Sequence, residues 1–179
     1  MFQVVTCRRT AHHFSNITSA LDEMHRILSP GGKLVIDDRN VPEDDFVDKL
    51  MNDLDRYHDA SHVRQYRSSE WQRMLQTSGF VIEAMNTYTQ HRSISSHTEG
   101  VEDAAVEKIL DMIGNLDDQQ RNKLNLVQEE GQTYYNRLVH HCFRLETVKV
   151  VWHPERVRKY GMFQTFSRRH SVGSTLPLG

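Results

Sequence analysis

The chain has 179 residues, of which 37% are hydrophobic and 26% are charged, and its formal net charge is −2. This length suits one domain with its own hydrophobic core. A net charge near zero argues against a nucleic-acid partner, because proteins that bind phosphate backbones carry a clear basic excess. No apolar run is long enough to span a membrane. The two cysteines, Cys7 and Cys142, lie far apart in the sequence and form no metal-binding pair, which favours a reduced, cytoplasmic protein without a metal ion.

The first 38 residues carry the pattern of a strand, a helix and a second strand. Phe2–Cys7 are apolar and β-branched and predict the first strand. Apolar residues at helical spacing follow Asn16, a residue type that caps helices, and the helix must end before Pro30-Gly31-Gly32. Leu34-Val35-Ile36 then show no polar alternation, which predicts a parallel strand covered on both faces. Because ligands bind beyond the carboxyl ends of such strands, a pocket is expected where this one stops, at Asp37-Asp38.

Two helices are predicted next. The first begins near Pro42 and keeps one apolar face as far as Tyr57. The second begins at a predicted capping box of Ser69 with Gln72 and ends at Gly79.

The remaining elements are predicted from shorter signals. Alternating side chains favour a strand over Phe80–Tyr88, and the polar stretch Thr89–Gly100 is expected to be a loop. A helix is predicted over Val101–Ile113, a weaker one from about Leu116, and a last strand over Phe143–Trp152. The chain is therefore expected to form one domain over residues 1–153, followed by a disordered basic tail over residues 154–179.

Three blocks of this sequence, in order, resemble a known family. They are Val4–Phe14 (VVTCRRTAHHF), Glu23–Asp38 (EMHRILSPGGKLVIDD) and Asp59–Phe80 (DASHVRQYRSSEWQRMLQTSGF). Together they resemble the carboxyl-terminal half of class I S-adenosylmethionine-dependent methyltransferases, and above all the type 11, ubiquinone-biosynthesis-like small-molecule branch. The resemblance covers about residues 2–153 and is strongest up to Phe80.

The resemblance implies an α/β fold, a Rossmann-like sheet whose last strand runs antiparallel to the others. The predicted strands Phe2–Cys7, Lys33–Asp38, Phe80–Tyr88 and Phe143–Trp152 would be the fourth to seventh strands of that sheet. The first three strands, which carry the glycine-rich cofactor loop and an acidic ribose ligand in the family, have no counterpart. Gly31-Gly32 does not replace that loop, because it follows a helix and precedes a strand.

An exposed edge strand is the expected consequence. Without its usual neighbour, Phe2–Cys7 would offer unpaired backbone groups to another chain. We therefore expect a truncated methyltransferase, a homodimer, or a protein that completes another chain through this edge.

The resemblance also implies a ligand site. It places Cys7, Arg8 and His13 near the cofactor, and His12 and His13 at the mouth of the pocket, where a histidine could orient an acceptor or take a proton. The alternative is that His13 and Phe14 only pack against the following helix.

The acceptor side is expected to include His12, Asp37 and a lid-like loop containing Ser61, His62 and Arg64. Asp37 could bind an acceptor hydroxyl, or it could cap the next turn. His62 and Arg64 could meet the substrate, or they could pair with acidic neighbours on the surface at a gain of only ~0–1 kcal/mol.

The function implied by the resemblance is methyl transfer from S-adenosylmethionine to a small-molecule acceptor, in which catalysis is mostly positioning and exclusion of water. The chain alone is expected to be inactive, because the cofactor loop is missing. The alternative is a non-catalytic remnant that acts as a dimerisation or interaction module.

Overall fold

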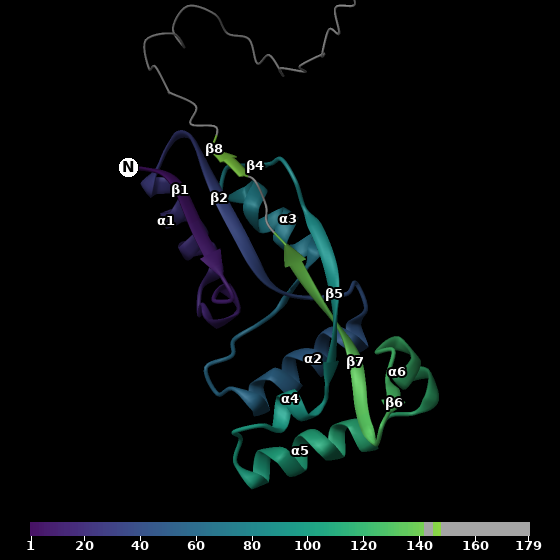
Figure 1. Ribbon diagram of the computed structural model, residues 1–179. Helices are drawn as coiled ribbons and strands as arrows, with labels where there is room; N and C mark the ends of the chain where they lie inside the picture. Colours follow the sequence, from purple (N-terminus) through teal and green to yellow (C-terminus); the bar gives the residue numbers. More distant parts are fainter. Residues whose placement is uncertain (142–144, 148–179) are drawn as a thin grey trace, which may run out of the picture. The chain divides into compact units, whose positions relative to one another are not determined.

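A computed structural model describes residues 1–141 and 145–147 of the chain, and within them β2 (Leu28–Val41) organises the sheet (Figure 1). β1 (Phe2–Arg8) runs parallel to β2, with Cys7 beside Ile36 and Arg8 beside Asp37. The short β3 (Tyr66–Arg67) also runs parallel to β2, beside its far end. The predicted parallel pairing of the first two strands is confirmed.

The predicted antiparallel last strand is present over the part that the structure describes. β8 (Leu145–Thr147) lies between β2 and β4 (Phe80–Ile82) and is antiparallel to both. The rest of the predicted strand Phe143–Trp152 lies outside the described residues, as does the predicted tail from residue 154 onward. The spatial order of these strands is β1, β2, β8, β4.

The sequence predicted that this strand would stop at Asp37-Asp38, but β2 does not stop there. It continues to Val41, because beyond Asp38 it gains two further neighbours, β3 and β7 (Gln132–His141). The aspartates instead lie where β1 ends. The expected cover on both faces is present only in part: Leu34 and Ile36 are buried, whereas Val35 is half-buried.

The strand predicted over Phe80–Tyr88 is broken in two, and the loop predicted over Thr89–Gly100 is wrong. After β4 the chain starts β5 (Asn86–Ser93), which is antiparallel to β7 along its whole length. β7 in turn forms a hairpin with β6 (Val127–Glu129) through Glu130-Gly131, both of which have positive φ. These strands were hidden by their polar side chains, which face solvent on one side.

Two groups of helices cover the sheet. α1 (Ile17–Ile27) and α3 (Ser68–Thr77) pack with β1 and β2 around a core that contains Leu21, Leu34 and Trp71. A second core lies around α2 (Asp45–His58), α4 (Ser95–Thr98) and α5 (Asp103–Gly114), which lie together in Figure 1. The short α6 (Asp118–Lys123) follows α5.

One of the two predicted helix caps is present and the other is not. Asn16 accepts a hydrogen bond from the Ser19 N–H at 3.0 Å and caps α1 as predicted. The predicted capping box of Ser69 with Gln72 is wrong: the Glu70 carboxylate accepts from the Arg67 N–H at 2.9 Å instead. Ser69 is drawn away because its N–H and hydroxyl both donate to Glu43. None of the helices within the described residues has the length and apolar character that crossing a membrane requires.

Gly32, near the start of β2, lies where the backbone is tightly packed. A Cβ at this position would lie 2.8 Å from the Ser29 carbonyl oxygen and 3.1 Å from the Phe2 carbonyl oxygen. We expect Gly32→Ala to lower the free energy of unfolding by about 1–3 kcal/mol, measured by urea denaturation, because the backbone must move. Gly114→Ala, at the end of α5 with no atom within 4 Å of the new Cβ, is the matched control. It should be neutral or stabilising by up to about 1 kcal/mol. Equal losses in the two variants would show that the turn has room to adjust.

Candidate functional site at the end of β1

The loop that follows β1 is held in an unusual conformation. Arg9 has a φ of 51°, a left-handed value that is costly for a residue with a Cβ. Its N–H donates to the Asp37 carbonyl oxygen at 2.7 Å, which fixes the turn. The chain then forms a short 3-10 helix, Ala11–His13, in which Ala11 and His12 are buried. The strained backbone of Arg9 therefore lies directly after the end of β1, beside the candidate site.

Asp38 anchors this loop. The His12 N–H donates to Asp38 Oδ2 at 3.1 Å, and His12 Nδ1 lies 2.5 Å from Asp38 Oδ1. Burial favours the neutral acid, but the hydrogen bonds and charge of His12, together with the Arg39 N–H, outweigh burial and lower the pKa of Asp38. Asp38 is therefore an ionised carboxylate, and both of its oxygens are occupied by the loop. Its role is to position His12.

The predicted lid does cover the histidine loop. The N–H groups of Val63 and Arg64 both donate to the His12 carbonyl oxygen, at 2.9 and 3.0 Å. Ser61 lies against His13, with its carbonyl oxygen 3.1 Å and its hydroxyl 3.0 Å from His13 Nδ1. The structure thus brings Ser61 to the predicted site through His13.

The side chains of two other residues of this segment, His62 and Arg64, do not line the cavity. His62 is buried, and its Nε2 donates to Asn52 Oδ1 at 3.0 Å. Burial lowers the pKa of His62 to about 4, so the ring is neutral near pH 7. Arg64 pairs with Asp48 and Glu70, each at 3.0 Å. Arg64 therefore pairs with acidic neighbours, as the alternative expected, whereas His62 is buried and contacts an amide rather than a surface acid.

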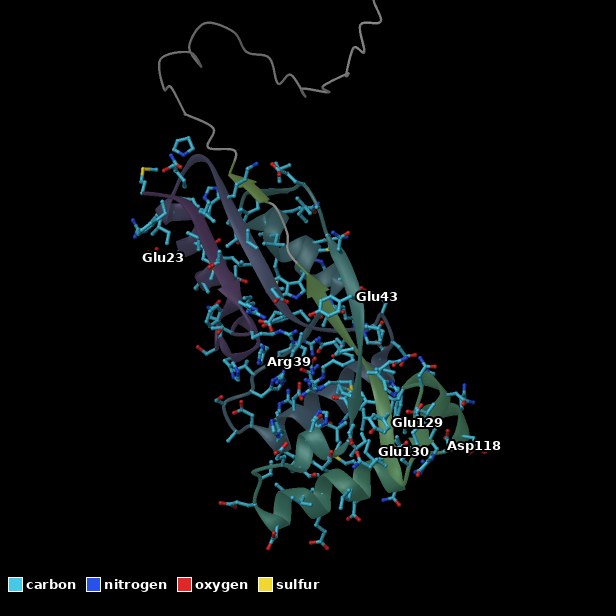
Figure 2. The ribbon with its side chains drawn as sticks, viewed as in Figure 1. Glu23, Arg39, Glu43, Asp118, Glu129 and Glu130 are labelled. Atoms are coloured by element: carbon cyan, nitrogen blue, oxygen red, sulfur yellow. The ribbon has the colours of Figure 1, made fainter. Side chains whose placement is uncertain are left out.

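A buried carboxylate, Asp55 of α2, holds two further arginines near the loop. Its oxygens lie 3.0 Å from Arg39 of β2, labelled in Figure 2, and 2.7 Å from Arg137 of β7. Gln65 also donates to Asp55 at 2.6 Å. Burial favours the neutral acid, but the charges of Arg137 and Arg39 and the hydrogen bond from His97 outweigh it and lower the pKa of Asp55. Asp55 is therefore a negative charge around which β2, β7 and α4 are fixed.

A cavity of about 410 Å³ opens between the loop, β2 and the β5–β7 pair. Its lining contains five arginines: Arg8, Arg9, Arg39, Arg92 and Arg137. His12, His13 and Gln90 complete it. The cavity has the size of a small-molecule site, and its polar lining is strongly basic.

The predicted site residues are distributed as follows. Arg8, His12 and His13 line the cavity together, and Asp37 lies behind them, 3.2 Å from Arg8 Nε. Cys7 belongs to the hydrophobic core, where burial raises the pKa of its thiol to about 11, so it is a neutral thiol near pH 7. Ser61 does not line the cavity but contacts it through His13.

Sequence reasoning missed half of the cavity. Gln90 and Arg92 lie in the stretch predicted to be a loop, and Arg137 lies on a strand that was not predicted. The i, i+2 spacing of Gln90 and Arg92 is the one local signal that could have indicated a shared face of a strand. Arg39 follows the two aspartates directly, but only the continuation of β2 points it to this site.

The comparisons with known proteins agree with this fold. Residues 1–85 match a family described as a methyltransferase domain. The chain is 43% identical over 74 residues to the uncharacterized methyltransferase YcgJ of Bacillus subtilis, covering 41% of this chain and 29% of YcgJ. It is 34% identical over 86 residues to the uncharacterized protein YafE of Escherichia coli, covering 48% of this chain and 42% of YafE.

Solved structures extend the match beyond the first half. BH2331 of Bacillus halodurans, a candidate methyltransferase, matches with a TM-score of 0.76 and 27% identity, covering 83% of this chain and 70% of that one. The structure of B. subtilis YcgJ matches with a TM-score of 0.74 and 26% identity, covering 83% and 64%. The chain is therefore similar to methyltransferases in fold and, over its first half, in sequence. It spans less than half the length of the curated relatives that it matches.

The described residues do not by themselves fit S-adenosylmethionine. No glycine-rich loop lies between a strand and a following helix within the described residues, because Gly31 and Gly32 lie inside β2, after a helix. The cavity lined by five arginines would also repel the positive sulfonium. Within the described part of the chain there is likewise no cluster of three His, Cys, Asp or Glu side chains that could hold a metal ion.

Proposed function

We propose that this chain is the acceptor-binding part of an S-adenosylmethionine-dependent methyltransferase that acts on a small molecule. The observation that supports this proposal is the cavity at the carboxyl end of β1, in a sheet related to methyltransferases. This is where open α/β sheets bind their ligands. In this role His12 and His13 would face the acceptor, and Arg8 and His13 would be the residues nearest to the cofactor.

The chain alone is proposed to be inactive. Its described residues contain no glycine-rich loop between a strand and a helix, and its matched segments cover only 29% of YcgJ and 42% of YafE. The cofactor would then need a segment that the described residues do not supply.

The proposal predicts that cofactor binding is restored by such a segment. In a chimera, the part of B. subtilis YcgJ that precedes its match to this chain would be joined to residue 1 of this chain. Isothermal titration with S-adenosylmethionine should give micromolar affinity for the chimera and no measurable binding to the chain alone. A folded chimera that does not bind the cofactor would count against the proposal.

A second candidate function is an interaction module, and the exposed edge of the sheet favours it. Within the described residues β1 pairs with β2 only, and Phe2 and Val4 are 59% and 56% exposed. An apolar edge of this kind can pair with a second copy or a complementing chain. Light scattering on the same samples separates the two candidates: a stable dimer of the chain, together with a chimera that does not bind the cofactor, favours the module.

A further inference from the structure

The charge of the cavity lined by the five arginines is not balanced by the acids around it. Two carboxylates each serve two arginines: Asp37 lies beside Arg8 and Arg9, and Asp55 lies beside Arg39 and Arg137. None of the eight lining residues is acidic. The cavity therefore retains excess positive charge, which favours an anionic ligand.

Arg92 is the cation most available to a ligand. Within the described part of the chain it makes no hydrogen bond or ion pair, and its side chain is exposed at the cavity. It lies two residues beyond Gln90 on β5, so both side chains lie on the same face of the strand. A guanidinium beside an amide offers several N–H donors at one place, and a guanidinium matches the two oxygens of a carboxylate or phosphate.

The other arginines are held in place before any ligand arrives. Arg39 and Arg137 are fixed by Asp55, and Arg9 Nη2 donates to the Tyr88 hydroxyl at 3.0 Å. Fixed donors lose little conformational entropy on binding, which raises affinity. Arg137 is only 7% exposed, and its Nε–H has no partner among the described residues, so the buried side of this cluster still has an unused donor.

The His97 ring reinforces this arrangement. Its Nε2 donates to Asp55 Oδ1 at 3.1 Å and lies 2.7 Å from Arg137 Nη2, so the ring holds the carboxylate that pairs with Arg137. Burial lowers the pKa of His97, because a charged ring would be poorly solvated and would lie beside Arg137. The neutral ring thus adds no positive charge, and it helps to orient the Arg137 guanidinium.

We propose that this cavity is an oxyanion subsite that binds a carboxylate or phosphate group of a small molecule, with Arg92 and Gln90 as direct ligands. We further assign this carboxylate or phosphate group to the methyl acceptor, and this assignment rests on the proposed function. A small ligand suits the cavity volume better than a nucleic acid does, and the net charge of −2 also argues against a polyanionic partner.

The test is a titration of the full chain with two probes, inorganic phosphate and succinate, followed by NMR of backbone amides or by calorimetry. No cofactor is present, so the result does not depend on methyl transfer. We expect saturable binding at millimolar or lower concentration, and a loss of about tenfold or more in Arg92→Gln, because a charge-assisted hydrogen bond is removed. Binding of one probe alone would identify the oxyanion as a phosphate or a carboxylate.

Arg73→Gln is the matched control, because Arg73 is also exposed and makes no ion pair within the described residues, but lies on α3, outside the cavity. Its affinity should equal that of the unmodified chain. Equal losses in both variants would indicate nonspecific charge attraction and overturn the proposal, as would the absence of saturable binding of either probe. Far-ultraviolet circular dichroism checks that both variants are folded. If phosphate binds but the chimera described above does not bind the cofactor, the subsite stands and only its assignment to a methyl acceptor is lost.

Discussion

Replacing Asp55 with alanine is expected to lower the free energy of unfolding by about 3–5 kcal/mol, because the change leaves buried charge without a partner. Arg137 is 7% exposed and depends on Asp55 for its ion pair, and Arg39 loses its partner at the same time. Urea denaturation near pH 7 measures the loss. Asp55→Asn should lose less, since an amide keeps the side-chain volume and one acceptor oxygen.

The sign of the pH dependence follows from the lowered pKa of Asp55. A carboxylate whose pKa is lower in the folded state stabilises the protein above its unfolded pKa of about 3.9, and this stability is lost as the pH falls through the folded pKa. The cost of Asp55→Ala should therefore be constant above about pH 5.

The control for Asp55 is Asp53, which lies two residues earlier on the more exposed side of α2. Asp53 pairs with Lys49 and Arg56, which are 80% and 51% exposed, so Asp53→Ala should cost no more than about 1 kcal/mol. If Asp55→Ala cost as little as this control, the Asp55 cluster would not be what fixes Arg39 and Arg137.

The second large expected effect is a loss of folding stability at acid pH that is caused by His62. The pKa of His62 is lowered to about 4 by burial, whereas an unfolded histidine titrates near 6.5. The unfolded state therefore binds the proton first as the pH falls, and stability that is present above about pH 6.5 is lost progressively down to the folded pKa. Between about pH 7 and pH 5 this loss should amount to about 2 kcal/mol.

The variant His62→Gln isolates this effect, because a glutamine amide can still donate to Asn52 but does not titrate. Urea denaturation of both proteins at the two pH values should show a smaller acid loss in the variant, by about 2 kcal/mol. NMR titration of the His62 ring in the unmodified protein gives an independent reading. A ring that titrates near 6.5, or an equal acid loss in both proteins, would contradict the burial argument.

Both effects bear on the site. Asp55 fixes two of the five arginines that line the cavity, and His62 belongs to the lid whose backbone is bonded to His12. Neither residue lines the cavity. Substituting Asp55 or His62 should weaken phosphate binding only because the folded arrangement is lost. Arg92→Gln, in contrast, should weaken binding without loss of the fold.

The sequence by itself determined the elements that depend on neighbouring residues. The strand, helix and strand from Phe2 to Asp38 follow from apolar spacing, the Asn16 cap and the glycine turn, all of which act within a few residues. The family resemblance placed the loop with His12 and His13 at a ligand site, and both histidines line the cavity.

Only the tertiary structure decided which distant strands pair and which charges meet. β5 pairs with β7, so Asn86 lies beside His141, and no local signal specifies that register. The same pairing brings Arg92 and Arg137 to one cavity with Arg39, while Asp55 arrives from a helix. Hydrophobic periodicity reports only on contacts near in sequence, and it is weak in polar strands such as these. The basic cavity could therefore be identified only from the tertiary structure, which brings its arginines together.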